Sequence, residues 1–118
     1  MEEQILWEGK PASLVDSAKR GLNGISYVIT NERLFVKSGL ISKKEEELEL
    51  YRVKDVKVTQ SLRERAQKIG QIEIISTDKT TPNISLKNVK NPFEVKEILR
   101  NAIRESKKEN NVAYREDI

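Results

Sequence analysis

The stretch Tyr27-Val28-Ile29-Thr30-Asn31-Glu32-Arg33-Leu34-Phe35-Val36-Lys37-Ser38-Gly39 decides how this chain folds. Two runs of strand-forming residues flank a short polar link at Asn31-Glu32. Val, Ile, Tyr and Phe suit the half-buried surface of a sheet, while Asn in a turn can bond its own backbone and tolerate a left-handed conformation. The stretch therefore predicts a β-hairpin whose alternate side chains point into a core.

The composition describes one domain with a modest core and a strongly charged surface. The 118 residues suffice for a single core and are too few for two full-sized domains. The 22 basic and 19 acidic residues leave a net charge of +3, so any attraction to nucleic acid or anionic lipid must come from local clusters. No apolar run approaches the roughly 20 residues that span a bilayer, and the start Met1-Glu2-Glu3 is acidic where a signal peptide would be basic. We expect a cytoplasmic protein, with a location peripheral to the membrane as the second option.

The chemistry available to the chain is restricted. It has no Cys and no His, which excludes disulfides and thiolate chemistry and removes the commonest metal ligand and general base. The sequence also contains no Gly-rich phosphate loop, no paired-carboxylate motif and no metal-ligand spacing. We expect a protein that is not an enzyme and that has no catalytic residues, no metal site and no cofactor.

Further strand patterns lie on both sides of the hairpin. Alternation of Glu and Leu over 47–50 has the period of a strand with one wet face, and the spacing of Val53 and Val56 predicts a turn or bulge near Lys54-Asp55. Residues 12–24 and 61–70 read as loops, the second one polar, basic and closed by Gly70. Beside the hairpin, the remaining strands are expected at 4–11, 45–50, 55–60, 71–77 and 83–87.

The last part of the chain changes period. Asn91 is a good N-cap and Pro92 suits the first helical position. The apolar residues Val95, Ile98, Leu99, Ala102 and Ile103 then follow at helical spacing. We predict a helix from 92 to about 106, which closes a single domain over 1–106 and leaves a charged, flexible tail at 107–118.

Seven strands followed by one helix is the element order of a pleckstrin-homology (PH) domain. The chain resembles the bacterial PH domain family, in particular its short membrane-associated-type module, over roughly residues 5 to 105. The residues that carry the resemblance are Leu6-Trp7-Glu8-Gly9-Lys10-Pro11, Tyr27-Val28-Ile29-Thr30-Asn31-Glu32-Arg33-Leu34, Gly39-Leu40-Ile41, Tyr51-Arg52-Val53-Lys54-Asp55-Val56, Gly70-Gln71-Ile72-Glu73-Ile74 and Asn91-Pro92-Phe93-Glu94-Val95.

The resemblance implies a fold and a broad kind of function. The fold is mainly β with one α-helix: a seven-stranded, strongly bent antiparallel sheet or partly open barrel, capped by a C-terminal amphipathic helix. The function is that of a non-catalytic binding module. Lipid-binding eukaryotic relatives carry basic residues at the end of the first strand and along the second. Lys10 matches the first position, but Ile25-Ser26-Tyr27-Val28 has no basic residue, which argues against specific phosphoinositide binding.

Three kinds of partner remain open. An anionic membrane surface could meet a first basic surface near one open end of the barrel, made of Lys10, Lys19, Arg20, Lys43 and Lys44. Nucleic acid is the alternative, through the basic segment 52–68, although Tyr51 is the only aromatic residue close to it in sequence. The candidate residues of this second patch are Arg52, Lys54, Lys57, Arg63, Arg65 and Lys68. A protein partner, including a second copy, could bind a sheet edge or the outer face of the helix.

Overall fold

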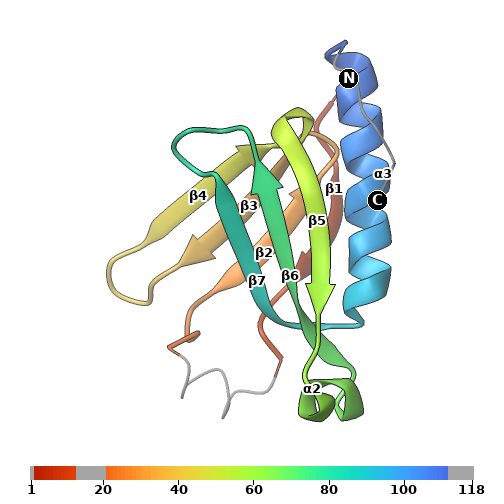
Figure 1. Cartoon of the computed structure of the whole chain (residues 1–118). Helices are drawn as coiled ribbons and strands as arrows, with labels where there is room; N and C mark the ends of the chain where they lie inside the picture. Colours follow the sequence, from red (N-terminus) through yellow and green to blue (C-terminus); the bar gives the residue numbers. More distant parts are fainter. Residues whose placement is uncertain (1, 13–20, 112–118) are drawn as a thin grey trace.

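Two antiparallel sheets and one long helix form the domain (Figure 1). The computed structural model describes residues 2–12 and 21–111. Four strands pair in the order β1-β2-β3-β4 and three in the order β5-β6-β7, so the seven predicted strands are confirmed. The elements are β1 (Ile5–Gly9), β2 (Ser26–Thr30), β3 (Arg33–Ser38), β4 (Lys44–Glu49), the 3-10 helix η1 (Leu50–Arg52), β5 (Val53–Thr59), α2 (Leu62–Ala66), β6 (Ile69–Ser76), β7 (Asn83–Lys90) and α3 (Pro92–Glu109). The sheets do not close into a barrel.

The predicted hairpin is β2 and β3, and its turn is held by the hydroxyl of Thr30. This oxygen accepts hydrogen bonds from the backbone N–H groups of Glu32 at 3.0 Å and Arg33 at 2.8 Å. Asn31 does not take the left-handed conformation that Asn tolerates in turns. Its side chain instead accepts from the Gln4 N–H at 2.6 Å, so it fastens the segment before β1 to the hairpin.

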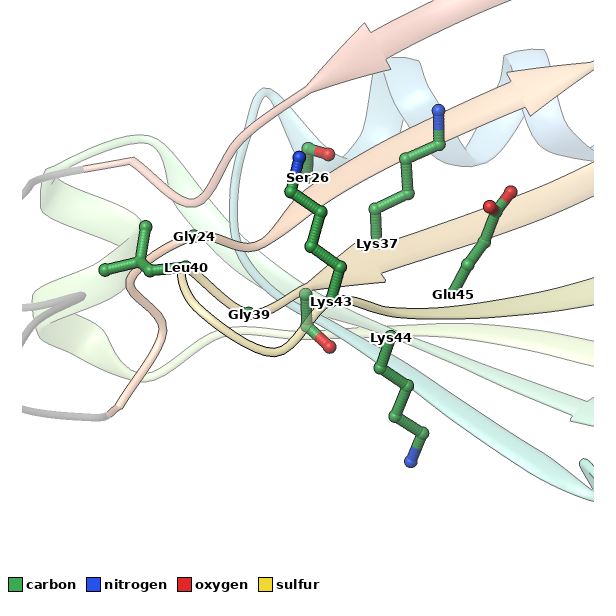
Figure 2. A pocket seen from close by; sticks show the side chains of 9 residues that line it. Gly24, Ser26, Lys37, Gly39, Leu40, Lys43, Lys44 and Glu45 are labelled. Atoms are coloured by element: carbon green, nitrogen blue, oxygen red, sulfur yellow. The ribbon is translucent and has the colours of Figure 1, made fainter.

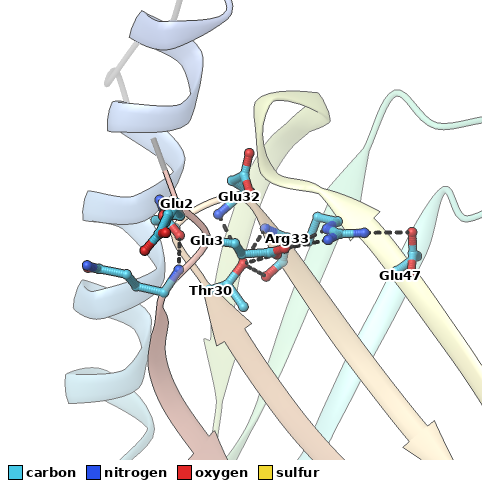
Figure 3. A network of polar contacts seen from close by, with 8 residues as sticks. Glu2, Glu3, Thr30, Glu32, Arg33 and Glu47 are labelled. Carbon is cyan, nitrogen blue, oxygen red and sulfur yellow. Dashed lines mark hydrogen bonds and ion pairs between the residues drawn. The ribbon is translucent and has the colours of Figure 1, made fainter.

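A polar network surrounds this turn (Figure 3). The Arg33 guanidinium forms an ion pair with Glu3 and a second one with Glu47 at 3.3 Å. Glu3 also accepts from the Thr30 hydroxyl at 2.7 Å. The hydrogen bond from Arg33, followed by that from Thr30, lowers the pKa of the Glu3 carboxyl.

Apolar side chains from both sheets and from α3 meet in one core. Tyr27 connects the two sheets, because its hydroxyl accepts the Lys87 N–H at 3.0 Å and donates to the Lys87 carbonyl at 3.1 Å. Burial raises the pKa of this tyrosine. Besides Tyr27, the fully enclosed members of the core are Ile29, Leu34, Leu48, Leu50, Val53, Ile72, Ile74, Leu86, Val89, Leu99 and Ile103.

Helix α3 has the predicted apolar stripe, with Val95, Leu99, Ala102 and Ile103 buried and Ile98 partly buried. It continues to Glu109, three residues beyond the predicted end, and therefore includes Lys107. That side chain is buried and its Nζ donates to the Tyr51 carbonyl at 3.0 Å, and the burial lowers its pKa. Asn91 occupies the predicted N-cap position, but its backbone is left-handed and its side chain forms no cap bond.

The segment after β5 differs from the prediction. The bulge predicted near Lys54-Asp55 is present, as a register shift between Val53 and Asp55. The predicted loop at 61–70 is wrong, because it contains α2 and the start of β6. A capping box stabilises the N-terminus of α2. The Ser61 hydroxyl accepts a hydrogen bond from the Glu64 N–H at 3.2 Å, and the Glu64 carboxylate accepts one from the Ser61 N–H at 3.0 Å.

Candidate functional site

The turn between β3 and β4 has a shape that only glycine permits. The strand pairing ends at Ser38 and Lys44, so residues 39–43 form the connection, which we call the β3–β4 turn. Gly39 has a φ of +97°, and a Cβ at this position would lie 1.9 Å from the carbonyl oxygen of Ser42. Any other residue at position 39 would therefore change the turn.

Two adjacent apolar side chains stand at the tip of the β3–β4 turn. Leu40 is 72% exposed and Ile41 is 100% exposed. A Cβ on Gly24, which also has a positive φ, would meet Leu40 at 3.0 Å, so Leu40 rests against the loop that precedes β2. Ile41 has no comparable support within the described part of the chain, and the two residues present apolar surface directly to solvent.

Lysines surround this tip and line a hollow of about 590 Å³ (Figure 2). Lys37 and Lys43 extend to the side of the turn where Ser26 lies, and Lys44 extends to the other side. This difference follows from the strand alternation, because Lys37 and Lys44 occupy opposite faces of the sheet. The hollow is lined by Gly24, Ser26, Lys37, Ser38, Gly39, Leu40, Lys43, Lys44 and Glu45.

Carboxylates further along β4 offset part of this positive charge. Glu46 pairs with Lys44 at 3.1 Å, and Glu45 lies opposite Lys37 in the strand register. The order of side chains from the tip is therefore apolar at 40–41, basic at 43–44 and acidic at 45–47. We call this order the polarity gradient of the turn.

The first predicted basic surface is only partly assembled by the described residues. Lys43 and Lys44 lie together, and they are joined by Lys37, which is not among the residues predicted for this surface. Lys10 lines a different hollow, of about 310 Å³, between β1 and α3, where Lys90 also lies. Lys19 and Arg20 lie outside the described residues.

The second predicted patch extends over the length of β5. Arg52 precedes the strand, and Lys54 and Lys57 are exposed on it. The other three residues follow the strand, so the two ends of the patch are about 20 Å apart. Lys57 lies opposite Glu73 on the neighbouring strand. The set therefore does not form one compact patch.

Two residues of the second patch meet in a smaller hollow of about 240 Å³. Arg65 and Lys68 line it together with Phe93, whose side chain at the start of α3 is 58% exposed. Lys68 has a left-handed backbone, and its carbonyl accepts the Asn91 N–H at 3.0 Å, which joins the end of α2 to the start of α3. The structure thus supplies an aromatic residue that lies far from this patch in the sequence.

Two features are absent from the described residues. No helix in this part of the chain is both long and apolar enough to cross a membrane. No three Asp or Glu side chains among the same residues gather into a group that could hold a metal ion.

Comparisons with known proteins identify the fold. The crystal structure of a DUF1696 family protein with a pleckstrin-homology domain from Shewanella loihica PV-4 is similar, with a TM-score of 0.63, 8% sequence identity and coverage of 86% of this chain and 80% of that one. Such low identity shows the fold alone. No curated protein matches the chain. The family model described as "Bacterial PH domain" matches residues 17–103, well over half of the sequence. The chain therefore belongs to the bacterial PH domain family.

Proposed function

We propose that the protein is a non-catalytic binding module that associates weakly and reversibly with an anionic membrane surface through the β3–β4 turn. PH domains in general are non-catalytic modules that contact proteins or lipids. The observation that carries the membrane assignment is the grouping of Lys37, Lys43 and Lys44 around one solvent-open hollow at a protruding turn.

The charge of this site supports weak binding. A lysine near an anionic bilayer contributes about 1 kcal/mol, so three contribute roughly 3 kcal/mol at most. Glu45 and Glu46 reduce this value, because they lie within the same region. An attraction of this size alone corresponds to association weaker than roughly millimolar, and salt weakens it further.

The site favours general anionic recognition over a specific inositol phosphate. The strand β2 contributes Ser26 to the hollow and carries no basic residue of its own. Lysines are flexible point charges and do not impose the fixed geometry of an arginine fork. We expect phosphatidylglycerol and other anionic lipids to bind comparably at equal surface charge.

Co-sedimentation with liposomes tests the proposal. Vesicles of phosphatidylcholine alone are compared with vesicles that also contain phosphatidylglycerol, at low and high salt. We expect binding to the anionic vesicles only, lost at high salt and reduced by Lys43→Glu/Lys44→Glu. The matched control is Lys54→Glu/Lys57→Glu on the exposed face of β5, which should bind as the wild type does. Absence of binding to every vesicle, or an equal loss in the control, would contradict the proposal.

The predicted contribution of Lys10, Lys19 and Arg20 to binding of an anionic membrane surface stays a prediction. The same assay tests it with Lys19→Glu/Arg20→Glu and, separately, Lys10→Glu. A loss of anionic binding in either variant would extend the site beyond the turn.

Protein contact is the second candidate function, and it is favoured by the surface around α2 and the start of α3. Leu62 is 84% exposed and Phe93 is 58% exposed, with Arg65 and Lys68 beside Phe93. Exposed aromatic and arginine side chains dominate the binding energy of many protein interfaces. Light scattering over a wide concentration range tests the version in which the partner is a second copy, because Leu62→Ser/Phe93→Ser should then dissociate it. A monomer at every concentration would exclude that version.

Nucleic acid is the weaker alternative. Within residues 2–12 and 21–111, Phe93 is the one aromatic side chain that shares a hollow with Arg65 and Lys68, whereas single-strand binders stack successive bases on several rings. Fluorescence anisotropy with a labelled single-stranded oligonucleotide should show no binding at moderate salt.

A further inference from the structure

We propose that the β3–β4 turn enters the bilayer tip first, with Leu40 and Ile41 below the lipid phosphates and Lys37, Lys43 and Lys44 at the level of the head groups. This inference rests on the proposed function and names the partner of that site as a lipid bilayer. It goes beyond charge attraction, because it assigns an apolar contact that no soluble polyanion offers.

The first argument is the exposure of the two tip residues. Large apolar side chains at six described positions are exposed, and only two pairs among them are adjacent in sequence. Ile5 and Leu6 lie on the strand β1, where they are 61% and 43% exposed and the register with β2 is irregular between Ile5 and Trp7. Leu40 and Ile41 lie in a protruding turn and are more exposed than that pair, so both can enter one apolar phase together.

The second argument is that the backbone presents these side chains and does not bury them. Gly39 adopts its positive φ and lies so close to Ser42 that the turn is tightly closed. Leu40 already rests against Gly24, so the loop that precedes β2 supports its side chain in this position. A turn of this kind reaches a membrane with its apolar surface preformed, so little ordering is required on binding.

The third argument is the polarity gradient of the turn. Moving away from the tip, the chain is apolar at 40–41, basic at 43–44 and acidic at 45–47. A bilayer leaflet has the complementary order, from acyl chains through phosphates to water. Lysines extend from both faces of the turn (Figure 2), and their long stems can lie along the apolar region while the ammonium groups reach the phosphates.

The fourth argument is that charge alone is too weak. Lys44 is already paired with Glu46, and Glu45 lies opposite Lys37. Stable attachment to a membrane normally needs two signals, such as apolar insertion together with a basic patch. The turn holds both within the eight residues from Lys37 to Lys44.

A fluorescent reporter at the tip tests the insertion directly. Trp7 is the only tryptophan, so Trp7→Phe/Ile41→Trp places the single reporter at the tip. The matched control, Trp7→Phe/Leu62→Trp, places it at a side chain of similar exposure on α2. Circular dichroism first confirms that both variants fold. Each is then mixed with vesicles of phosphatidylcholine and phosphatidylglycerol, with and without lipids brominated along the acyl chains.

We expect the emission of the tip reporter to shift to the blue and to be quenched by the brominated lipids, while the control reporter changes in neither respect. In the otherwise wild-type chain, Leu40→Ser/Ile41→Ser should lower partitioning into the anionic vesicles by at least about tenfold. Leu62→Ser should leave the partitioning unchanged.

The outcomes separate the two proposals. Binding to anionic vesicles without a blue shift or quenching at position 41 would overturn insertion and leave the surface association intact. Equal quenching of both reporters would overturn the tip-first orientation. Failure of the wild type to bind any vesicle would overturn both proposals.

Discussion

At the scale of single residues, Glu3 and Arg33 join the segment before β1 to the central hairpin. The Glu3 carboxylate receives hydrogen bonds from Arg33 and Thr30, so its pKa is lower in the folded chain than its ordinary value of 4.5. The resulting stabilisation is present above pH 4.5 and is lost as the pH falls through the lower folded-state pKa. Both partners are partly exposed, with side-chain exposures of 31% and 25%, so the contribution is at most about 1 kcal/mol.

Urea unfolding of the wild type and of Glu3→Gln tests this dependence. We expect the wild type to be more stable at pH 7 and the difference to shrink below about pH 4.5. Glu47→Gln serves as the control, because Glu47 is the other carboxylate that pairs with Arg33, at 3.3 Å, and its side chain is more exposed, at 51%. A difference that does not depend on pH would show that the ionised form of Glu3 is not the stabilising one.

The hairpin at residues 27–39 shows what the sequence could and could not predict at this scale. Alternating β-branched and aromatic residues predicted both strands and the turn, because this pattern is local. The partner of the Asn31 side chain is Gln4, which lies 27 residues away. A long-range contact of this kind depends on the pairing of β1 with β2, so no local pattern indicates it.

At the scale of elements, α2 is unusual because it buries none of its own side chains against the described residues. A five-residue helix is marginal in water, so its capping box is the main support that the sequence provides. We expect Ser61→Ala to weaken the helix by about 1 kcal/mol and to leave the global stability nearly unchanged.

Amide hydrogen exchange distinguishes these two effects. The Gln67 N–H donates to the Arg63 carbonyl at 3.2 Å, so Ser61→Ala should speed its exchange. The amides of the central strand β6 should exchange as in the wild type. A large drop in global unfolding free energy would mean that α2 supports the core after all.

The two helices and the β3–β4 turn differ in how far local sequence patterns predict them. The apolar period of α3 predicted a helix and its buried face, since that face packs on the core. The Ser61-to-Glu64 spacing is a capping box, but no apolar period follows it, so 61–70 read as a loop. Leu40 and Ile41 enter the sequence argument only as part of Gly39-Leu40-Ile41 in the family resemblance, because no local pattern marks an apolar residue as exposed. The sequence signal for this exposed pair is two apolar residues directly after a glycine, followed by Ser42 and two lysines.

At the scale of the whole molecule, Tyr27 holds the two sheets together. Its hydroxyl forms two hydrogen bonds with the backbone of Lys87, one as acceptor and one as donor. Tyr27→Phe leaves both backbone groups without this partner, and we expect a loss of about 1–3 kcal/mol in unfolding free energy. Urea denaturation measures the loss, with Tyr51→Phe as the control for a hydroxyl outside the contact between the sheets. An unchanged unfolding free energy in Tyr27→Phe would mean that water replaces the hydroxyl.

The number of strands and the final helix were predictable from the sequence, but the separation into two sheets was not. Local patterns reveal strands, whereas the pairing of β1 through β4 and of β5 through β7 depends on contacts between distant segments. Asn88 shows this dependence. It has a left-handed backbone within β7 and is buried, and its carbonyl accepts the Ala12 N–H at 2.7 Å.

The self-contained nature of α2 makes it a convenient position for protein engineering. Because its side chains contribute nothing to the core, its outer surface can be recoded to carry a dye or a metal-binding tag. Figure 1 shows it at the end of the molecule where β5 gives way to β6. Energy transfer from a label there, or from one at the β3–β4 turn, to acceptor dyes in a bilayer would report how the domain tilts when it meets a surface.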